Sequence, residues 1–144
     1  MRNPAFIVVA LAAAAAAAES PRSAYVVIAN PGTPVSRLDR KFVGEVFLRR
    51  VTRWPDDTPI RPVDLGPDAR ARIRFSEEVL SRSVASVRSY WQQRIFSGQG
   101  LPPPELPDDE AVVSYVLSHP GAIGYVAAGA ALNGAKVLEV IEGT

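Results

Sequence analysis

Two apolar segments, one near each end of the sequence, place the strongest constraint on how this chain folds. Residues 24–29 read Ala-Tyr-Val-Val-Ile-Ala, and residues 122–126 read Ala-Ile-Gly-Tyr-Val. The first segment has no polar face, which is typical of a central strand covered by helices on both sides and not of an edge strand. The second follows a Pro-Gly turn and is also predicted to be a strand.

The segment after the first strand carries a mixture of helix and strand signals. Ser36 precedes an apolar stripe with helical spacing, and Asp39 stands at the capping-box position of that helix. The stretch from Ile60 to Leu65 is predicted to be a second strand, which Pro62 should keep short or near a sheet edge.

Three further helices and a last strand follow from the spacing of apolar residues. The helices are expected over 68–80, over 84–96 with Ser83 as the cap, and over 110–118, and the strand over 137–141. The predicted inward residues of the four helices are, in chain order, Leu38, Phe42, Val43, Val46 and Phe47, then Ile73, Phe75, Val79 and Leu80, then Val84, Val87, Trp91 and Ile95, and finally Val112, Val113, Val116 and Leu117. Strands that alternate with helices predict an α/β fold, a three-layer sandwich in which helices flank a small mixed β-sheet.

The first 18 residues have the features of a secretory signal peptide. Arg2 is followed by an uncharged run from Ala5 to Ala18, whose last alanines supply the small residues that a signal peptidase requires. A membrane anchor is the alternative, but the run is shorter than the roughly 20 residues needed to cross a bilayer. We therefore predict cleavage after Ala18, an exported domain spanning residues 19–144, and no transmembrane segment in the mature chain.

Composition excludes several classes of function. The chain has no cysteine and one histidine, His119, so it offers no disulfide, no thiolate metal site, no cysteine nucleophile and no second histidine for a metal or catalytic cluster. We interpret His119 as the residue at a helix C-terminus and not as a catalytic base. The predicted protein is not an enzyme and uses neither a metal nor a cofactor, and a small hydrolase is the least favoured alternative.

Charge is balanced over the whole chain but unevenly distributed. The 16 Lys and Arg stand against 15 Asp and Glu, a balance that lacks the basic excess typical of nucleic-acid binding. Residues 37–94 hold 13 basic and 8 acidic residues, whereas residues 95–144 hold one lysine and six acidic residues. An anion or an acidic partner would therefore bind the first half, and the alternative is an ordinary solvated surface with local ion pairs.

Three arginines, Arg70, Arg72 and Arg74, lie in the first turns of one predicted helix. Helical spacing aligns Arg70 and Arg74 with Glu78 in a surface charge ladder, and it places Arg72 on the apolar stripe. Arg72 is therefore an anion ligand or a buried anchor, and the alternative is an exposed arginine whose stem covers apolar surface. Asp68 at the same helix start would repel an anion.

Aromatic residues offer a weaker signal. Trp54, Tyr90 and Trp91 could line a site for a sugar or an aromatic ring. Trp91 has helical spacing and is most simply a core residue, and Trp54 is predicted to cover a loop.

Several segments, taken together and in this order, resemble a known family. They are Val26–Gly32, Val46-Phe47-Leu48 followed by Trp54, Phe75 within a helix, and Pro120–Val126. The set resembles the periplasmic phosphate-binding proteins of ABC transporters, which have the type 2 periplasmic-binding-protein fold. The pattern is similar in particular to short exported proteins of little more than one lobe, through Arg72-x-x-Phe75, Tyr90-Trp91, Ile95-Phe96-x-Gly98 and Pro102-Pro103.

The resemblance implies one lobe of this fold, a periplasmic location, and candidate ligand-binding residues at Arg72, Arg70, Asn30 and Gly32. Full-length relatives hold phosphate with an Arg-x-Asp-x-Ser-Gly segment, completed by Thr or Ser, just before the helix that carries the equivalent of Phe75. The matching residues 65–71 read Leu-Gly-Pro-Asp-Ala-Arg-Ala, so the arginine and the hydroxyls are not in their places. The partner lobe is also missing.

The resemblance therefore transfers the fold and the location but not phosphate binding. We expect an exported recognition module for a small oxyanion or for a periplasmic or membrane protein partner, with no role in binding nucleic acid.

Overall fold

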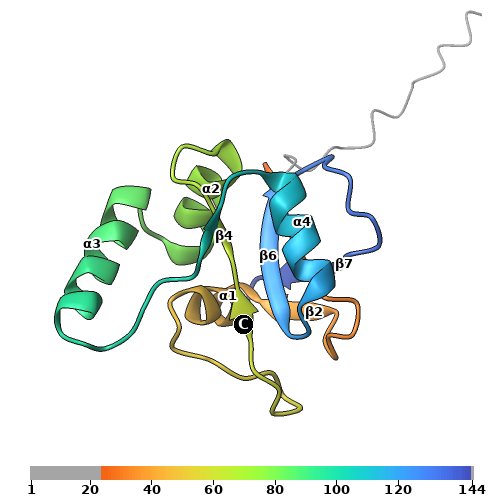
Figure 1. The fold of residues 1–144 in the computed structure, drawn as a ribbon, viewed down its shortest axis with the longest axis horizontal. Helices are drawn as coiled ribbons and strands as arrows, with labels where there is room; N and C mark the ends of the chain where they lie inside the picture. The colour runs from red at the N-terminus through yellow and green to blue at the C-terminus, as the bar shows by residue number, and fades with distance from the viewer. Residues whose placement is uncertain (1–23, 144) are drawn as a thin grey trace, which may run out of the picture.

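The computed structural model describes residues 24–143, and its centre is a five-stranded mixed sheet (Figure 1). The strand order across the sheet is β2-β7-β1-β6-β3. β1 runs antiparallel to both β6 and β7, whereas β2 pairs with β7 and β3 pairs with β6 in parallel. The five strands are β1 (Tyr25–Ala29), β2 (Arg37–Asp39), β3 (Arg61–Pro62), β6 (Ala122–Ala127) and β7 (Lys136–Ile141). The two apolar segments of the sequence are thus neighbours at the centre of the sheet.

Helices cover both faces of this sheet, as the side chains along β6 show. Gly124 faces helix α4 (Asp109–Ser118), because a β-carbon at Gly124 would lie 2.8 Å from Cγ1 of Val112. Tyr125 is the next residue and therefore points to the opposite face. There its ring stacks on Phe75 with 4.0 Å between the centroids. The predicted α/β sandwich is confirmed.

The second face carries helix α1 (Arg40–Phe47) and helix α2 (Arg70–Phe75), which continues as a π-helical turn, η1 (Ser76–Leu80). Aromatic rings fill the space beneath them. Phe75 lies 4.7 Å from Phe47 and 5.5 Å from Tyr25, both measured between ring centroids and both edge-to-face. All of these rings are buried, so this cluster is the core of the domain.

Helix α1 begins later than predicted, because residues 37–39 form β2. Leu38 was expected on the helix and is buried on a strand, opposite Val140 of β7. Asp39 stands at the N-cap of α1, but its side chain makes no capping hydrogen bond. Strand pairing with a distant segment overrides the local helical spacing here.

The strand predicted from Ile60 to Leu65 is divided into two. β3 lies at the sheet edge, as its proline predicted. The chain then leaves the sheet as β4 (Asp64–Leu65), which pairs in parallel with β5 (Glu105–Leu106). Residues 98–107 are rich in Gly and Pro, a composition that favours a loop, yet Glu105 and Leu106 form a strand.

The α2–η1 segment buries part of the predicted apolar stripe, with Arg72 on it as expected. Arg72, Phe75, Ser76 and Val79 are buried, with the i, i+3, i+4, i+7 spacing of one helix face. Ile73 was expected to point inward but is 40% exposed, since Arg72 takes the inward position beside it.

Trp54 was predicted to cover a loop, but it is part of the core. Its side chain is buried, and its Nε1 donates a hydrogen bond to the Gly121 carbonyl at 3.1 Å. Gly121 has a φ of 82°, and a β-carbon there would lie 2.2 Å from the carbonyl oxygen of Pro59. This contact requires glycine at the turn before β6.

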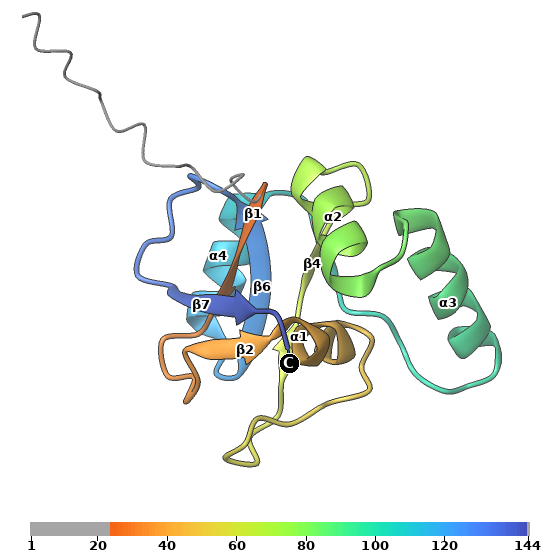
Figure 2. The same ribbon diagram turned by 180° about the vertical axis from the view of Figure 1, so that it is seen from behind.

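Helix α3 (Val84–Phe96) stands apart from the sheet in both views (Figures 1 and 2). Ser83 caps it as predicted, with its hydroxyl accepting a backbone hydrogen bond at 3.0 Å. Of the predicted apolar face, Val87 and Trp91 are buried, whereas Ile95 is 49% exposed. The buried residues of this helix therefore lie in its middle.

We refer to residues 84–104, which are α3 and the loop after it, as the arm, and to residues 24–83 and 105–143 as the body. Figure 2 shows the arm projecting to one side of the body. Helix α4 in the body is capped by Asp108, and Val112, Val113 and Val116 are its buried residues.

The predicted signal peptide, residues 1–18, lies outside the described residues. Between residues 24 and 143, no helix combines the length and the apolarity required to cross a bilayer.

Candidate functional site

Four residues of the segment 65–71, which the sequence resemblance aligned with a phosphate motif, border a surface cavity of about 240 Å³: Leu65, Ala69, Arg70 and Ala71. The N-terminal end of α4 lies on the same cavity. There Asp108 accepts a hydrogen bond from the Ala111 N–H at 2.8 Å, and Asp109 accepts one from the Ala127 N–H at 3.2 Å. An anion at this position would meet two carboxylates, and the backbone N–H groups of Ala111 and Ala127 already bond to these carboxylates.

Arg70 also lines this cavity and is exposed. The predicted charge ladder forms without it, because Arg74 pairs with Glu78 at 2.9 Å and with Glu77 at 3.7 Å. Among residues 24–143, no carboxylate lies within ion-pair distance of Arg70.

Arg72 is buried, with 5% of its surface exposed, so the exposed alternative is wrong. Its Nη1 donates a hydrogen bond to the Leu65 carbonyl at 2.7 Å. The same nitrogen lies 3.9 Å from Oδ2 of Asp64 and 4.0 Å from Oε2 of Glu105. Arg72 therefore joins α2 to β4 and β5, as a buried anchor does.

Asp64 is buried beside Arg72, and its carboxylate accepts a hydrogen bond from the Tyr125 hydroxyl at 2.8 Å. Loss of water around the carboxylate raises the pKa of Asp64 to about 6, although the charge of Arg72 opposes that rise. Burial, together with the charge of Asp64, holds the pKa of Tyr125 above its usual range. The tyrosine hydroxyl therefore keeps its proton and donates it.

Asn30 and Gly32 lie at the end of β1 and line a separate cavity of about 290 Å³. The Asn30 amide donates a hydrogen bond to the Val116 carbonyl at 2.9 Å and accepts one from the Gly32 N–H at 2.9 Å. These bonds tie the end of β1 to the end of α4. The polar groups of Asn30 are used within the fold and shape the cavity wall.

The structure thus distributes the four predicted site residues over three cavities. Arg70 lines one and Arg72 another, and Asn30 and Gly32 share the third. Ligand binding by any of them stays a prediction.

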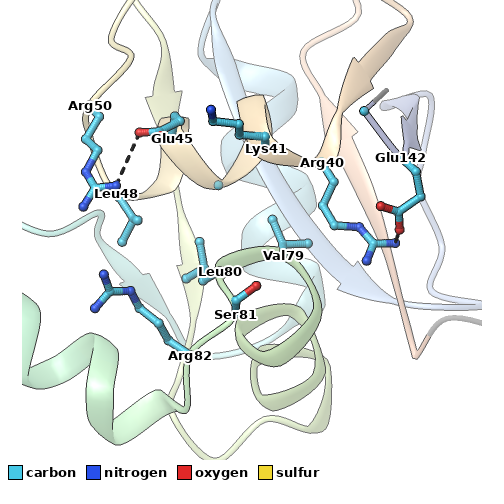
Figure 3. Close-up of a pocket in the computed structure, with 12 residues that line it drawn as sticks. Arg40, Lys41, Glu45, Leu48, Arg50, Val79, Leu80, Ser81, Arg82 and Glu142 are labelled. Carbon is cyan, nitrogen blue, oxygen red and sulfur yellow. Dashed lines mark ion pairs between the residues drawn. The ribbon is translucent and has the colours of Figure 1, made fainter.

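A larger cavity, about 440 Å³, lies between α1 and η1, and the sequence analysis did not single it out (Figure 3). Leu48, Val79 and Leu80 supply its apolar lining. The two helical segments approach closely at Gly44, where a β-carbon would lie 3.0 Å from the Val79 carbonyl oxygen. We refer to this cavity as the basic pocket because of the side chains around it.

Cationic groups outnumber carboxylates around the basic pocket. Arg40 pairs with Glu142, and Arg50 pairs with Glu45 at 3.6 Å (Figure 3). Across residues 24–143, no carboxylate lies within ion-pair distance of the other two cations. The ionic residues that line the pocket are Arg40, Lys41, Arg50, Arg82, Glu45 and Glu142. Two positive charges are therefore left without a carboxylate partner, and the basic excess of residues 37–94 was the sequence signal for them.

Arg82 is held in place by the turn that ends η1. Ser81 has a left-handed φ of 54°, and the Ser76 hydroxyl donates to the Arg82 carbonyl at 2.7 Å. The guanidinium carbon of Arg82 lies 5.2 Å from the centroid of the Tyr90 ring, within the range of a cation–π contact. Both contacts reduce the freedom that Arg82 would lose on binding an anion.

His119 follows α4 and stacks on Tyr115 with 3.8 Å between ring centroids. The Ser118 hydroxyl lies 3.0 Å from its Nδ1, which resembles a nucleophile–base pair. The Tyr115 carbonyl, however, lies 2.8 Å from the same nitrogen and can only accept, so Nδ1 carries the proton and cannot take one from the serine. Among residues 24–143, no group of three His, Asp or Glu forms a candidate metal site.

Comparison with known proteins gives matches in structure alone. No family model matches the sequence, and no curated protein matches it. The chain is similar to a Clostridium perfringens protein described as a phosphate ABC transporter substrate-binding protein and solved with bound phosphate, with a TM-score of 0.62 and 17% identity over 81% of this chain and 44% of that one. An ABC-type phosphate transport receptor from Vibrio cholerae gives a TM-score of 0.58 and 17% identity, over 80% of this chain and 45% of that one. PstS from Borrelia burgdorferi gives a TM-score of 0.57 and 15% identity, over 81% of this chain and 47% of that one.

The chain therefore spans less than half the length of these proteins. It has the α/β fold of one lobe of a PstS-like phosphate-binding protein, as its sequence motifs predicted. At these identities the likeness establishes the fold and no ligand.

Proposed function

We propose that this protein is an exported, non-enzymatic recognition module that binds a small oxyanion of the phosphate or sulfate class in the basic pocket. The observation that carries the proposal is that Lys41 and Arg82, two of the cations that line a cavity of about 440 Å³, have no carboxylate partner among residues 24–143. Lysine and arginine donors are those that proteins use most for such anions.

The proposed site differs in place from the one that the family resemblance implies. At residues 65–71 an anion would approach Asp108 and Asp109, whereas the basic pocket has a positive balance. The pocket is open to solvent, and none of residues 24–143 closes over it, so we expect modest affinity that weakens as salt is added.

Export to the periplasm is part of the same proposal. It rests on the leader-like residues 1–18 and on the resemblance to binding proteins of ABC transporters. The exported domain would then comprise residues 19–144.

The test is a thermal-denaturation series in phosphate and in sulfate, with chloride at matched ionic strength as the reference. Saturating anion should raise the melting temperature by a few degrees, roughly 2–4 °C or more. The double variant Lys41→Gln/Arg82→Gln should lose the rise, and Arg61→Gln, an exposed cation outside the pocket, should keep it. An equal response in chloride, or a rise that survives in the double variant, would reject the proposal.

A protein partner is the second candidate. The observation that favours it is the group of exposed apolar side chains at the end of the arm, which an anion site does not explain.

A further inference from the structure

The arm and the body enclose a cavity of about 150 Å³ that the proposed anion site does not use. Its apolar lining comes mostly from the arm, and its charged lining mostly from the body. The residues around it are Val84, Arg88, Trp91, Gln92, Ile95, Pro102 and Pro103 from the arm and Asp64, Pro67, Arg72 and Glu105 from the body. We call this cavity, together with the exposed residues Phe96 and Leu101 beside it, the arm groove.

The guanidinium of Arg72 in this cavity is incompletely satisfied. A guanidinium carries five N–H donors, and the described part of the chain gives Arg72 one hydrogen bond, to the Leu65 carbonyl. Its Nε is fully buried and has no partner. Unpaired donors in the interior are costly, so an occupant with a carbonyl or carboxylate oxygen would stabilise this residue.

The rest of the cavity suits an apolar group. A void of about 150 Å³ is comparable to an engineered protein cavity that binds benzene, so it accommodates one ring or one branched aliphatic side chain. Trp91 and Ile95 line it, and the segment 102–103 completes the apolar part. An occupant therefore needs an apolar body and an oxygen acceptor nearby.

Two large apolar side chains that are next in sequence to lining residues of the cavity are exposed to solvent. Phe96 is 95% exposed and Leu101 is 69% exposed, and each directly follows or precedes a residue that lines the cavity. Large apolar side chains that are left exposed to water are candidates for contact with a partner.

The charge of the arm specifies the partner further. Residues 84–104 contain Arg88 and Arg94 and no acidic residue. Arg88 itself lines the cavity. A partner segment with acidic residues is complementary to this surface, and a basic one is repelled.

We propose that the arm groove binds an extended peptide segment of a partner protein in which a side chain of leucine or phenylalanine size stands next to acidic residues. The apolar side chain enters the cavity, an oxygen of the segment accepts from Arg72, and the acidic residues face Arg88. This site shares no lining residue with the basic pocket, so the two proposals can be tested separately.

The test is selection from a phage-displayed library of random peptides on the immobilised protein, followed by anisotropy measurements with synthetic copies of the selected sequences. We expect sequences that pair Leu, Phe, Met or Trp with Asp or Glu. The double variant Phe96→Ser/Leu101→Ser should weaken their binding roughly tenfold or more, because both side chains lose apolar burial. Val137→Ser, which removes a half-exposed apolar side chain on β7, is the matched control and should bind as the native protein does.

Several outcomes would overturn the inference. They are the absence of selected peptides, selection of basic sequences, and binding that survives in the double variant. Two further measurements address other occupants. If the native protein sediments with vesicles of equal phosphatidylglycerol and phosphatidylcholine and the double variant does not, the surface binds a membrane. If the native protein forms a dimer and the double variant does not, the surface binds a second copy of the chain. Lys41→Gln should leave peptide binding unchanged, which separates this result from that of the anion test.

Discussion

The body and the arm differ in how their apolar residues are used. In the body, rings from β1, β6, α1 and α2 lie between the sheet and the helices, and hardly any of their surface meets water. In the arm, Val87 and Trp91 are buried, while Phe96 and Leu101 face solvent. The comparison indicates that the apolar burial that stabilises the fold is concentrated in the body, and that the arm keeps apolar surface available for contact.

The largest expected effect is on the body. Phe75→Ala removes the ring that stacks on Tyr125 and should lower the free energy of unfolding by about 3–5 kcal/mol, measured by chemical denaturation. Phe96→Ala is the matched change in the arm and should alter stability by less than about 0.5 kcal/mol. Similar losses in the two variants would show that arm and body do not differ in this way.

The second prediction is a change in the free energy of unfolding with pH, on the order of 2 kcal/mol, caused by Asp64 at the junction of body and arm. Its pKa of about 6 in the folded protein exceeds the ordinary value for aspartate, so the folded state binds more protons than the unfolded state between about pH 4 and pH 6. The free energy of unfolding that Asp64 contributes should therefore fall as the pH rises through this window. Asp64→Asn should remove that fall in a series of denaturation curves.

The slope with pH is the informative quantity, because Asp64→Asn also changes the contact with Arg72. Asp57→Asn, at an exposed turn, provides the control and should keep the native pH dependence. An unchanged slope in Asp64→Asn would contradict the raised pKa.

The smallest effect is expected at the start of the arm. Ser83→Ala removes the cap of α3 and should lower the free energy of unfolding by about 1 kcal/mol. Hydrogen exchange should quicken in the first turn of α3 while amides of β1 and β6 stay protected, since the arm opens by itself. Ser86→Ala is the matched control, because its backbone N–H and not its side chain makes the capping bond. Equal loss of protection in the sheet would mean that the arm is no separate unit.

The sequence was most informative where structure is decided locally. The cap at Asp108, the cap at Ser83 and the apolar runs of β1 and β6 each follow from a few neighbouring residues. Their structural cause lies within the segment itself, so spacing and residue type were sufficient.

The features that were missed depend on distant partners. Residues 37–39 form β2 because β7 lies beside them, about a hundred residues further along the chain. Ile73 is exposed because Arg72 finds its acceptor on β4. The basic pocket likewise combines α1, η1 and Glu142, and only its excess charge was visible in the sequence.

The pairing of β1 also has a consequence for the order of events in folding. Val27 stands opposite Tyr125 on one side and Leu138 on the other, so the first strand finds both neighbours only near the end of the chain. A growing polypeptide cannot close this sheet until residues 122–138 have been made. Contacts of such long sequence separation slow the rate-limiting step. We therefore expect the body to fold late and in one step, and a fragment that ends before Ala122 to have no sheet around β1.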